Sequence, residues 1–146
     1  PLFDEALPPL AERAVQKGLL FRQRIETDLP PVMGNRDVYE MVVRNLLDNA
    51  IKFTPSGSIQ VAARRDNGAV VIEVSDDGIG IPTESINNLF KRFYRTQTAV
   101  ERGIAGTGLG LYMVKENLRN YNGHIAVQST LGKGTTFTIR LPVAQI

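Results

Sequence analysis

The chain has 146 residues, 42% of them hydrophobic and 22% charged, which is enough for one domain with its own core and excludes disorder as the main state. With no cysteine and one histidine, the sequence excludes disulfides, thiolate zinc sites and His-rich metal sites, and a formal charge of +2 argues against a nucleic-acid partner. No apolar run approaches the roughly 18 residues of a membrane span, so no direct membrane contact is expected.

The chain starts at Pro1 rather than at a methionine, which suggests a piece of a longer protein. Residues 1–18 carry a short helical pattern that stops at Gly18, and we expect this stretch to be a loosely ordered connection. A strand is predicted at residues 19–26. The folded domain is therefore expected to cover residues 19–146.

The strongest helix signal runs from Asn35, which suits the N-cap position, to Phe53. Alternating apolar residues then predict strands near residues 59–63 and 70–74. The Asn67-Gly68 step between them suits a tight hairpin turn. This part of the chain is predicted to be one long helix followed by a β-hairpin.

The second half of the chain is predicted to contain two more helices and two more strands. Residues 83–93 look helical and lead into a polar, glycine-punctuated segment. A further helix runs to about residue 120 with Gly123 as its stop, and strands follow at residues 124–129 and 135–141. This order favours an α+β fold: a two-layer α/β sandwich with a mixed sheet of about five strands, covered on one face by about three helices.

Three polar side chains lie along one side of the long helix. At 100° per residue, Asn45, Asn49 and Lys52 project within about 60° of one another, opposite most of the bulky apolar residues. An amide oxygen can ligate Mg²⁺, and the lysine can meet a phosphate. A solvated helix face explains the same residues, so this line alone does not establish a site.

The strand at residues 70–74 runs into a glycine-containing turn that ends at Ile81. An ionised Asp76 only accepts hydrogen bonds, so it suits an exocyclic amine such as that of adenine. Gly78 and Gly80 have no Cβ and let the backbone approach a flat ligand closely. An ordinary glycine turn with a capping aspartate is the alternative interpretation.

A second glycine-rich segment, residues 106–110, opens the next helix. The free backbone amides and the dipole at such a helix start attract phosphate. A flexible loop that merely ends in a helix is the alternative. The glycine spacing is not the dinucleotide fingerprint, and the Gly-Lys-Gly-Thr at residues 132–135 lacks the upstream glycine of a Walker sequence.

In this order and with these gaps, the motifs resemble the catalytic ATP-binding domain of sensor histidine kinases (GHKL superfamily, Bergerat fold), a superfamily that also includes DNA gyrase, a heat-shock chaperone and mismatch-repair ATPases. Residues 45–54 are similar to the N box of that family, and residues 76–81 to its first glycine box. Residues 90–95 are similar to its F box, and residues 106–111 to its second glycine box. The resemblance covers nearly the whole chain.

The resemblance implies a site for ATP and Mg²⁺. Asn45, Asn49 and Lys52 would be the catalytic residues, with Asn49 as the metal ligand and the other two near the phosphates. Phe53 would lie beside the adenine, and Asp76, the first of two aspartates, would recognise it. The other implied nucleotide-binding residues are Gly78, Gly80 and Ile81 in the pocket, Arg92 and Arg95 in a mobile ATP lid at about residues 91–107, and the second glycine box, Gly106, Thr107, Gly108, Leu109 and Gly110.

Position 45 bears on the type of reaction. Hydrolysing relatives have a glutamate one helical turn before the metal-binding asparagine, where it acts as the base on water. Asn45 cannot act as a base at neutral pH, which favours phosphoryl transfer to an outside nucleophile. His124 begins a predicted strand and is interpreted as structural, so the nucleophile is expected elsewhere.

The resemblance therefore implies a histidine acceptor in a separate dimerisation domain, to which residues 1–18 connect, and a relay to the receiver domain of a response regulator. It also implies a cytoplasmic domain that is monomeric when isolated. Two alternatives stay open: a nucleotide-gated binding module without kinase activity, and an ATPase of the gyrase or chaperone type.

Overall fold

The computed structural model describes residues 2–30, 32, 35–92, 94–95 and 110–143, and the side chains from residue 7 onward. In chain order, its elements are α1 (Leu2–Gln16), β1 (Leu20–Ile25), α2 (Arg36–Lys52), β2 (Ser58–Asp66), β3 (Ala69–Asp76), α3 (Thr83–Ile86), α5 (Gly110–Arg119), β4 (His124–Thr130) and β5 (Gly134–Pro142).

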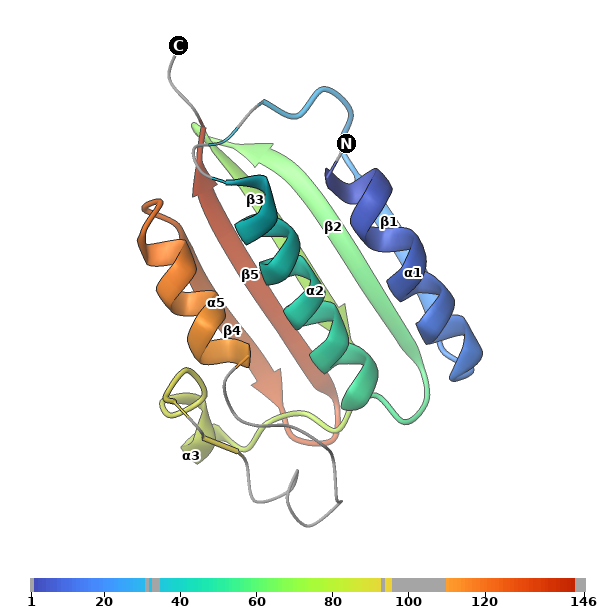
Figure 1. Ribbon diagram of the computed structural model, residues 1–146. Helices are drawn as coiled ribbons and strands as arrows, with labels where there is room; N and C mark the ends of the chain where they lie inside the picture. The colour runs from blue at the N-terminus through green and yellow to red at the C-terminus, as the bar shows by residue number, and fades with distance from the viewer. Residues whose placement is uncertain (1, 31, 33–34, 93, 96–109, 144–146) are drawn as a thin grey trace.

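The five strands form one mixed sheet in the order β1-β2-β3-β5-β4. β1 runs parallel to β2, and the other neighbouring strands are antiparallel. Figure 1 shows α1, α2 and α5 side by side across one face of this sheet. The prediction of a two-layer α+β sandwich with a mixed five-stranded sheet is confirmed.

α2 lies at the centre of the helical layer and has the predicted ends. The Asn35 side chain accepts a 2.7 Å hydrogen bond from the backbone N–H of Asp37, which caps the first turn. At the other end, the N–H of Phe53 donates to the carbonyl of Asn49 at 2.9 Å. The apolar side of the helix is buried, with Leu46 and Leu47 fully enclosed.

The predicted hairpin joins β2 and β3. Asn67 has φ of 43° and Gly68 has φ of 77°, so both central residues adopt the left-handed conformation that this turn requires. Alternate residues of the two strands then face the helices, and those in the core are Ile59, Val61, Ala63, Val70, Ile72 and Val74.

Residues 7–17 differ from the expected loose connection. Leu7, Leu10 and Ala14 are at most 5% exposed and belong to the main core, because their spacing places all three on one side of α1. Pro8 and Pro9 lie inside the helix with their rings exposed. The described part of α1 is therefore an integral element of the fold.

Two helix ends also differ from the predictions. α3 stops at Ile86 rather than near residue 93, and the chain continues as turns, with the N–H of Asn88 bonded to the carbonyl of Ser85 at 3.0 Å. Asn122, not Gly123, has the left-handed conformation that ends α5, with φ of 58°.

Candidate functional site

The predicted polar line on α2 is present in the structure. Asn45, Asn49 and Lys52 are half-buried, whereas Leu46 and Leu47 on the other side of the helix are fully buried. The line is therefore neither part of the core nor a freely solvated face.

Asn45 lies next to the start of α5. Its Nδ2 donates to the Met41 sulfur at 2.8 Å. A Cβ atom placed on Gly110 would lie 3.5 Å from the Asn45 amide oxygen, so the first residue of α5 is adjacent to this side chain. The structure thus brings the helix start that we predicted to attract phosphate beside the polar line on α2.

Lys52 is held by a carboxylate to which the sequence analysis gave no role. Its Nζ lies 3.0 Å from Oδ2 of Asp48, and the other carboxylate oxygen accepts a 2.7 Å hydrogen bond from Arg13 on α1. Burial raises the pKa of the Asp48 carboxyl, but the bonds from the two cations outweigh it and hold the pKa below its usual range. Sequence patterns do not reveal this contact because Arg13 and Asp48 are 35 residues apart.

Asp76 ends β3 with its carboxylate half-buried. Its Oδ1 accepts a 2.8 Å hydrogen bond from the N–H of Gly78. Burial raises the pKa of Asp76 to about 6, although the N–H groups of Gly78 and Thr135 act to lower it. The contacts within the protein therefore do not fully stabilise the ionised carboxylate. A hydrogen-bond donor on a ligand would favour this ionised form.

Thr54 adds a buried hydroxyl to this corner. It is 0% exposed, and its Oγ1 has no hydrogen-bond partner of good geometry among the described residues. The hydroxyl nevertheless lies close enough to the Asp76 carboxylate to lower its pKa. A buried hydroxyl without a partner is costly, so this position is suited to an incoming polar group. The resemblance to the N box ends at Thr54 and gives this hydroxyl no role of its own.

Asp77 has a different environment from Asp76. Its Oδ2 accepts hydrogen bonds from the hydroxyl of Ser58 at 2.6 Å and from the Ser58 N–H at 3.1 Å. Its side chain is exposed and joins the start of β2 to the end of β3. Of the two aspartates, Asp76 is the more buried, and the hydrogen bonds to its carboxylate do not fully offset that burial.

Gly78 and Gly80 are required by contacts within the protein. A Cβ on Gly78 would lie 2.2 Å from the Phe53 carbonyl oxygen, and one on Gly80 would lie 2.2 Å from the Thr130 carbonyl oxygen. Gly80 also has φ of 73°. The glycines therefore allow the turn to pack between the end of α2 and the β4–β5 turn, a requirement that the sequence pattern alone does not show. Their contribution to a ligand pocket stays a prediction.

Ile81 is fixed by the next turn of the sheet. Its N–H donates to the Ser129 hydroxyl at 2.8 Å, and that hydroxyl donates to the Gly134 carbonyl at 2.9 Å. The Ile81 side chain packs against the main core. Hydrogen bonds therefore join the segment at residues 79–81 to the β4–β5 turn and the strand ends that flank it.

The described part of the F box packs on α5 and β5. Phe90 meets Phe137 edge to face at 6.4 Å between ring centres. Arg92 donates to the Tyr112 hydroxyl at 2.9 Å, and its guanidinium lies 4.9 Å from the centre of that ring. Arg95 is half-buried.

Part of the predicted site lies outside the described residues. Gly106, Thr107, Gly108, Leu109 and most of the predicted lid at residues 91–107 belong to that part. Gly110 is described and begins α5.

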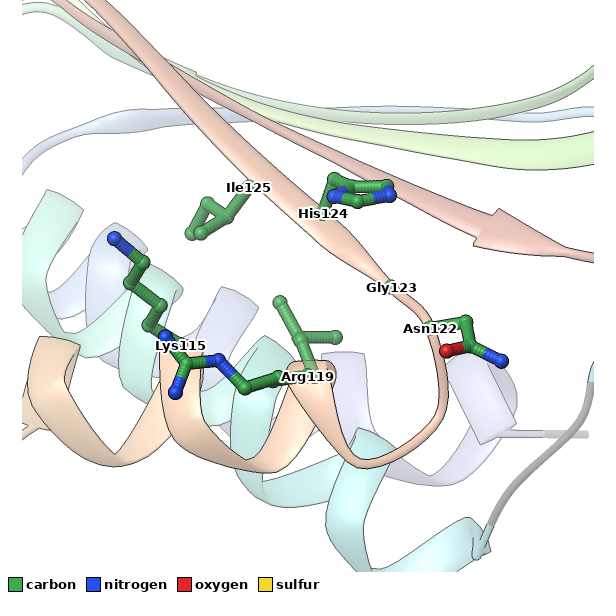
Figure 2. A pocket seen from close by; sticks show the side chains of 7 residues that line it. Lys115, Arg119, Asn122, Gly123, His124 and Ile125 are labelled. Atoms are coloured by element: carbon green, nitrogen blue, oxygen red, sulfur yellow. The ribbon is translucent and has the colours of Figure 1, made fainter.

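His124 lies away from the polar line of α2, at the first position of the edge strand β4. His124 lines a hollow of about 340 Å³ between the end of α5 and the start of β4, together with Lys115, Arg119 and Asn122. Figure 2 shows these side chains. The side chain of His124 is exposed. No described carboxylate lines this hollow.

The end of α2, the turn after β3 and the start of α5 lie at the same end of the molecule (Figure 1). The N–H of Ile79 donates to the Phe53 carbonyl at 2.9 Å, which joins the Asp76 turn to the end of the helix that carries Asn49 and Lys52. Phe53 itself is half-buried at this junction. The structure therefore brings an acceptor carboxylate and a line of amides and ammonium to one end of the fold.

The mixed five-stranded sheet under a layer of helices is the fold of the ATP-binding catalytic domains of histidine kinases. Residues 34–145 match the family model described as "Histidine kinase-, DNA gyrase B-, and HSP90-like ATPase". The chain belongs to this family.

Named relatives fall in the histidine kinase branch. The chain is 40% identical to the sensor histidine kinase RcsC of Escherichia coli K12 over 120 residues, which is 82% of this chain and 13% of RcsC. Among solved structures, the mycobacterial sensor histidine kinase MprB matches 99% of this chain and 95% of its own, with a TM-score of 0.83 and 27% identity. Full-length ShkA in complex with AMPPNP matches 99% of this chain and 30% of its own, with a TM-score of 0.83 and 26% identity. The chain thus spans a small part of the full-length relatives.

Within the described part of the chain, no helix combines the length and the apolar character that crossing a bilayer requires.

Proposed function

We propose that this domain binds ATP together with Mg²⁺ and transfers the γ-phosphoryl group to a histidine outside these residues. Family membership and the half-buried acceptor Asp76 support ATP as the substrate. The observation that carries transfer rather than hydrolysis is at position 45. This position, one helical turn before Asn49, is where a base would have to act on water. It carries the amide of Asn45, which is hydrogen-bonded to the Met41 sulfur and cannot act as that base.

Asn49 is suited to hold the metal. Its side chain is half-buried, and among the described residues nothing hydrogen-bonds to it, so its amide oxygen is available to a hard cation. The described residues contain no group of three or more His, Cys, Asp or Glu side chains that could hold a metal ion. Phosphate oxygens and water would therefore complete the coordination, and bound Mg²⁺ would neutralise phosphate charge.

In the proposed transfer, a lone pair of the acceptor imidazole forms a bond to the γ-phosphorus. The bond from phosphorus to the β,γ-bridging oxygen breaks, and ADP leaves with that electron pair. The protein's part is to position groups and neutralise charge: Lys52 and the lid residues Arg92 and Arg95 would meet the phosphates, beside Asn45. Asp76 and Phe53 would hold the adenine, with the turn through Gly78, Gly80 and Ile81 around it. The second glycine box, Gly106 to Gly110, would supply backbone amides to phosphate.

The partners in this proposal are a dimerisation and histidine-acceptor domain and, after it, the receiver domain of a response regulator. α1 would then be both part of this fold and the link to the acceptor domain. We propose that the isolated domain is monomeric and acts in the cytoplasm.

The test adds the parent protein's dimerisation domain to the purified chain with γ-labelled ATP and Mg²⁺. We expect acid-labile, base-stable phosphohistidine on the added domain and slow phosphate release by the chain alone. Tight nucleotide binding without transfer would support a nucleotide-gated binding module instead. Steady phosphate release without the acceptor would support an ATPase of the gyrase or chaperone type.

A further inference from the structure

Asp48 is the point at which α1 meets the charged end of α2. One oxygen of its carboxylate lies 2.7 Å from the Arg13 guanidinium, and the other lies 3.0 Å from the Lys52 ammonium. The Asp48 and Lys52 side chains are 27% and 35% exposed, so both are partly shielded from solvent. One negative charge is therefore shared between two positive charges from different helices.

The helix geometry lets Lys52 face either Asp48 or the polar line. At 100° per residue, Lys52 projects about 40° from Asp48 on one side and about 60° from Asn49 on the other. The ammonium sits on a flexible four-carbon stem with three donors, so it can turn between the two directions. The hold of Asp48 on Lys52 thus competes with any phosphate that binds beside Asn49.

The position of Arg13 depends on how α1 is docked. The ammonium of Lys17, just after α1, donates to the Ile51 carbonyl at 2.5 Å, on the last turn of α2. Leu7, Leu10 and Ala14 also anchor α1 through their contacts in the main core. Any movement of α1 relative to α2 would therefore move Arg13 relative to Asp48.

We propose that Asp48 is a positioning residue that sets how readily Lys52 reaches the nucleotide phosphates, and that Arg13 tunes it from α1. This inference rests on the proposed nucleotide function. With Arg13 docked, the Asp48 charge is shared between two cations, so Lys52 is held less tightly and turns more readily to the phosphates. When α1 withdraws Arg13, Asp48 binds Lys52 alone, and the site binds phosphate more weakly. The docking of α1 would thereby control whether the positive charge of Lys52 is available to the phosphates.

The test measures the affinity of the chain for Mg²⁺·ATP and for adenosine, which lacks phosphates. Asp48→Asn should tighten ATP binding and Arg13→Gln should weaken it, each by about two- to fivefold, because partly exposed ion pairs are modest in strength. Neither should change adenosine affinity. Arg13→Lys keeps the cation and should therefore retain most of the ATP affinity that Arg13→Gln loses. The comparison of these two variants also tests the inference if Asp48→Asn does not fold.

A double-mutant cycle separates this coupling from a general field effect. In the Asp48→Asn background, Arg13→Gln should have no further effect on ATP affinity, whereas independent charges would add. Glu40→Gln, which breaks the 3.0 Å pair with Arg44 on the same helix, is the matched control and should leave ATP affinity unchanged.

Additive effects in the cycle, or shifts of both single variants in the same direction, would overturn this inference while leaving the proposed function intact. Equal changes in ATP and adenosine affinity would also overturn it, because they would indicate a structural effect. If the unmutated chain bound no ATP at all, the proposed function would fall, and this inference with it.

Discussion

The carboxyl group of Asp76 lowers the stability of the folded protein at neutral pH, and its proposed role in recognition explains its presence. Burial raises its pKa from 3.8 to about 6, so ionisation is less favourable in the folded state than in the unfolded chain. Below about pH 4 the carboxyl group is protonated in both states and does not lower the free energy of unfolding. Its destabilising effect develops as the pH rises through about 6, where the group ionises in the folded protein.

Asp76→Asn should therefore stabilise the nucleotide-free protein at neutral pH. At about 1.4 kcal/mol per pKa unit, the difference of roughly two units gives up to about 3 kcal/mol at pH 7, and almost none near pH 4. The amide keeps an oxygen that can accept from Gly78. Urea unfolding of both proteins at the two pH values measures the effect. An equal difference at both pH values would show that the carboxyl group is not the cause.

Gly78 is expected to matter before any ligand binds. A Cβ there would lie 2.2 Å from a backbone carbonyl oxygen, so Gly78→Ala should destabilise the nucleotide-free protein by about 1–3 kcal/mol. Gly110→Ala is the matched control, because its Cβ would make only an ordinary contact at 3.5 Å. Thermal unfolding compares them, and equal stability of the two variants would mean that the first glycine box serves the ligand alone.

Among the elements, α2 could be predicted almost to the residue, and α1 could not. The α2 sequence has an N-cap asparagine and a continuous apolar side, and both are local signals. In α1 the Pro8-Pro9 pair is a local signal against a continuous helix, whereas burial of Leu7, Leu10 and Ala14 decides the outcome. α3 ends early because Asn87 and Asn88, both weak helix formers, follow Ile86.

The burial of α1 gives a prediction at the level of the element. Leu7 is 1% exposed, so Leu7→Ala should destabilise the protein by about 2–5 kcal/mol. Val15, on the same helix, is 63% exposed, and Val15→Ala should change stability by less than about 0.5 kcal/mol. Urea unfolding of the two variants checks this. A loss below 1 kcal/mol for Leu7→Ala would show that α1 is loosely held after all.

For the whole molecule, the sequence was enough to predict the mixed five-stranded sheet and the helical layer, because most of their elements have a local pattern. It was not enough to reveal Asp48 as a bridge or Thr54 as a buried hydroxyl beside Asp76. Both depend on residues brought together from distant positions in the chain. The reason for Gly78 was likewise hidden, since the Phe53 carbonyl that it accommodates comes from another element.

The proposed function depends on the half-buried Asp76 carboxylate, which would recognise the purine of a nucleotide whose phosphates meet the polar line of α2. Its most direct test is a calorimetric titration with ATP and with inosine triphosphate, which carries a carbonyl oxygen in place of the exocyclic amine. We expect ATP to bind at least about tenfold more tightly than the inosine nucleotide, because a charged acceptor loses its donor. Asp76→Asn should remove this preference, and Asp77→Asn should keep it. Equal affinity of the unmutated chain for the two nucleotides would contradict the account.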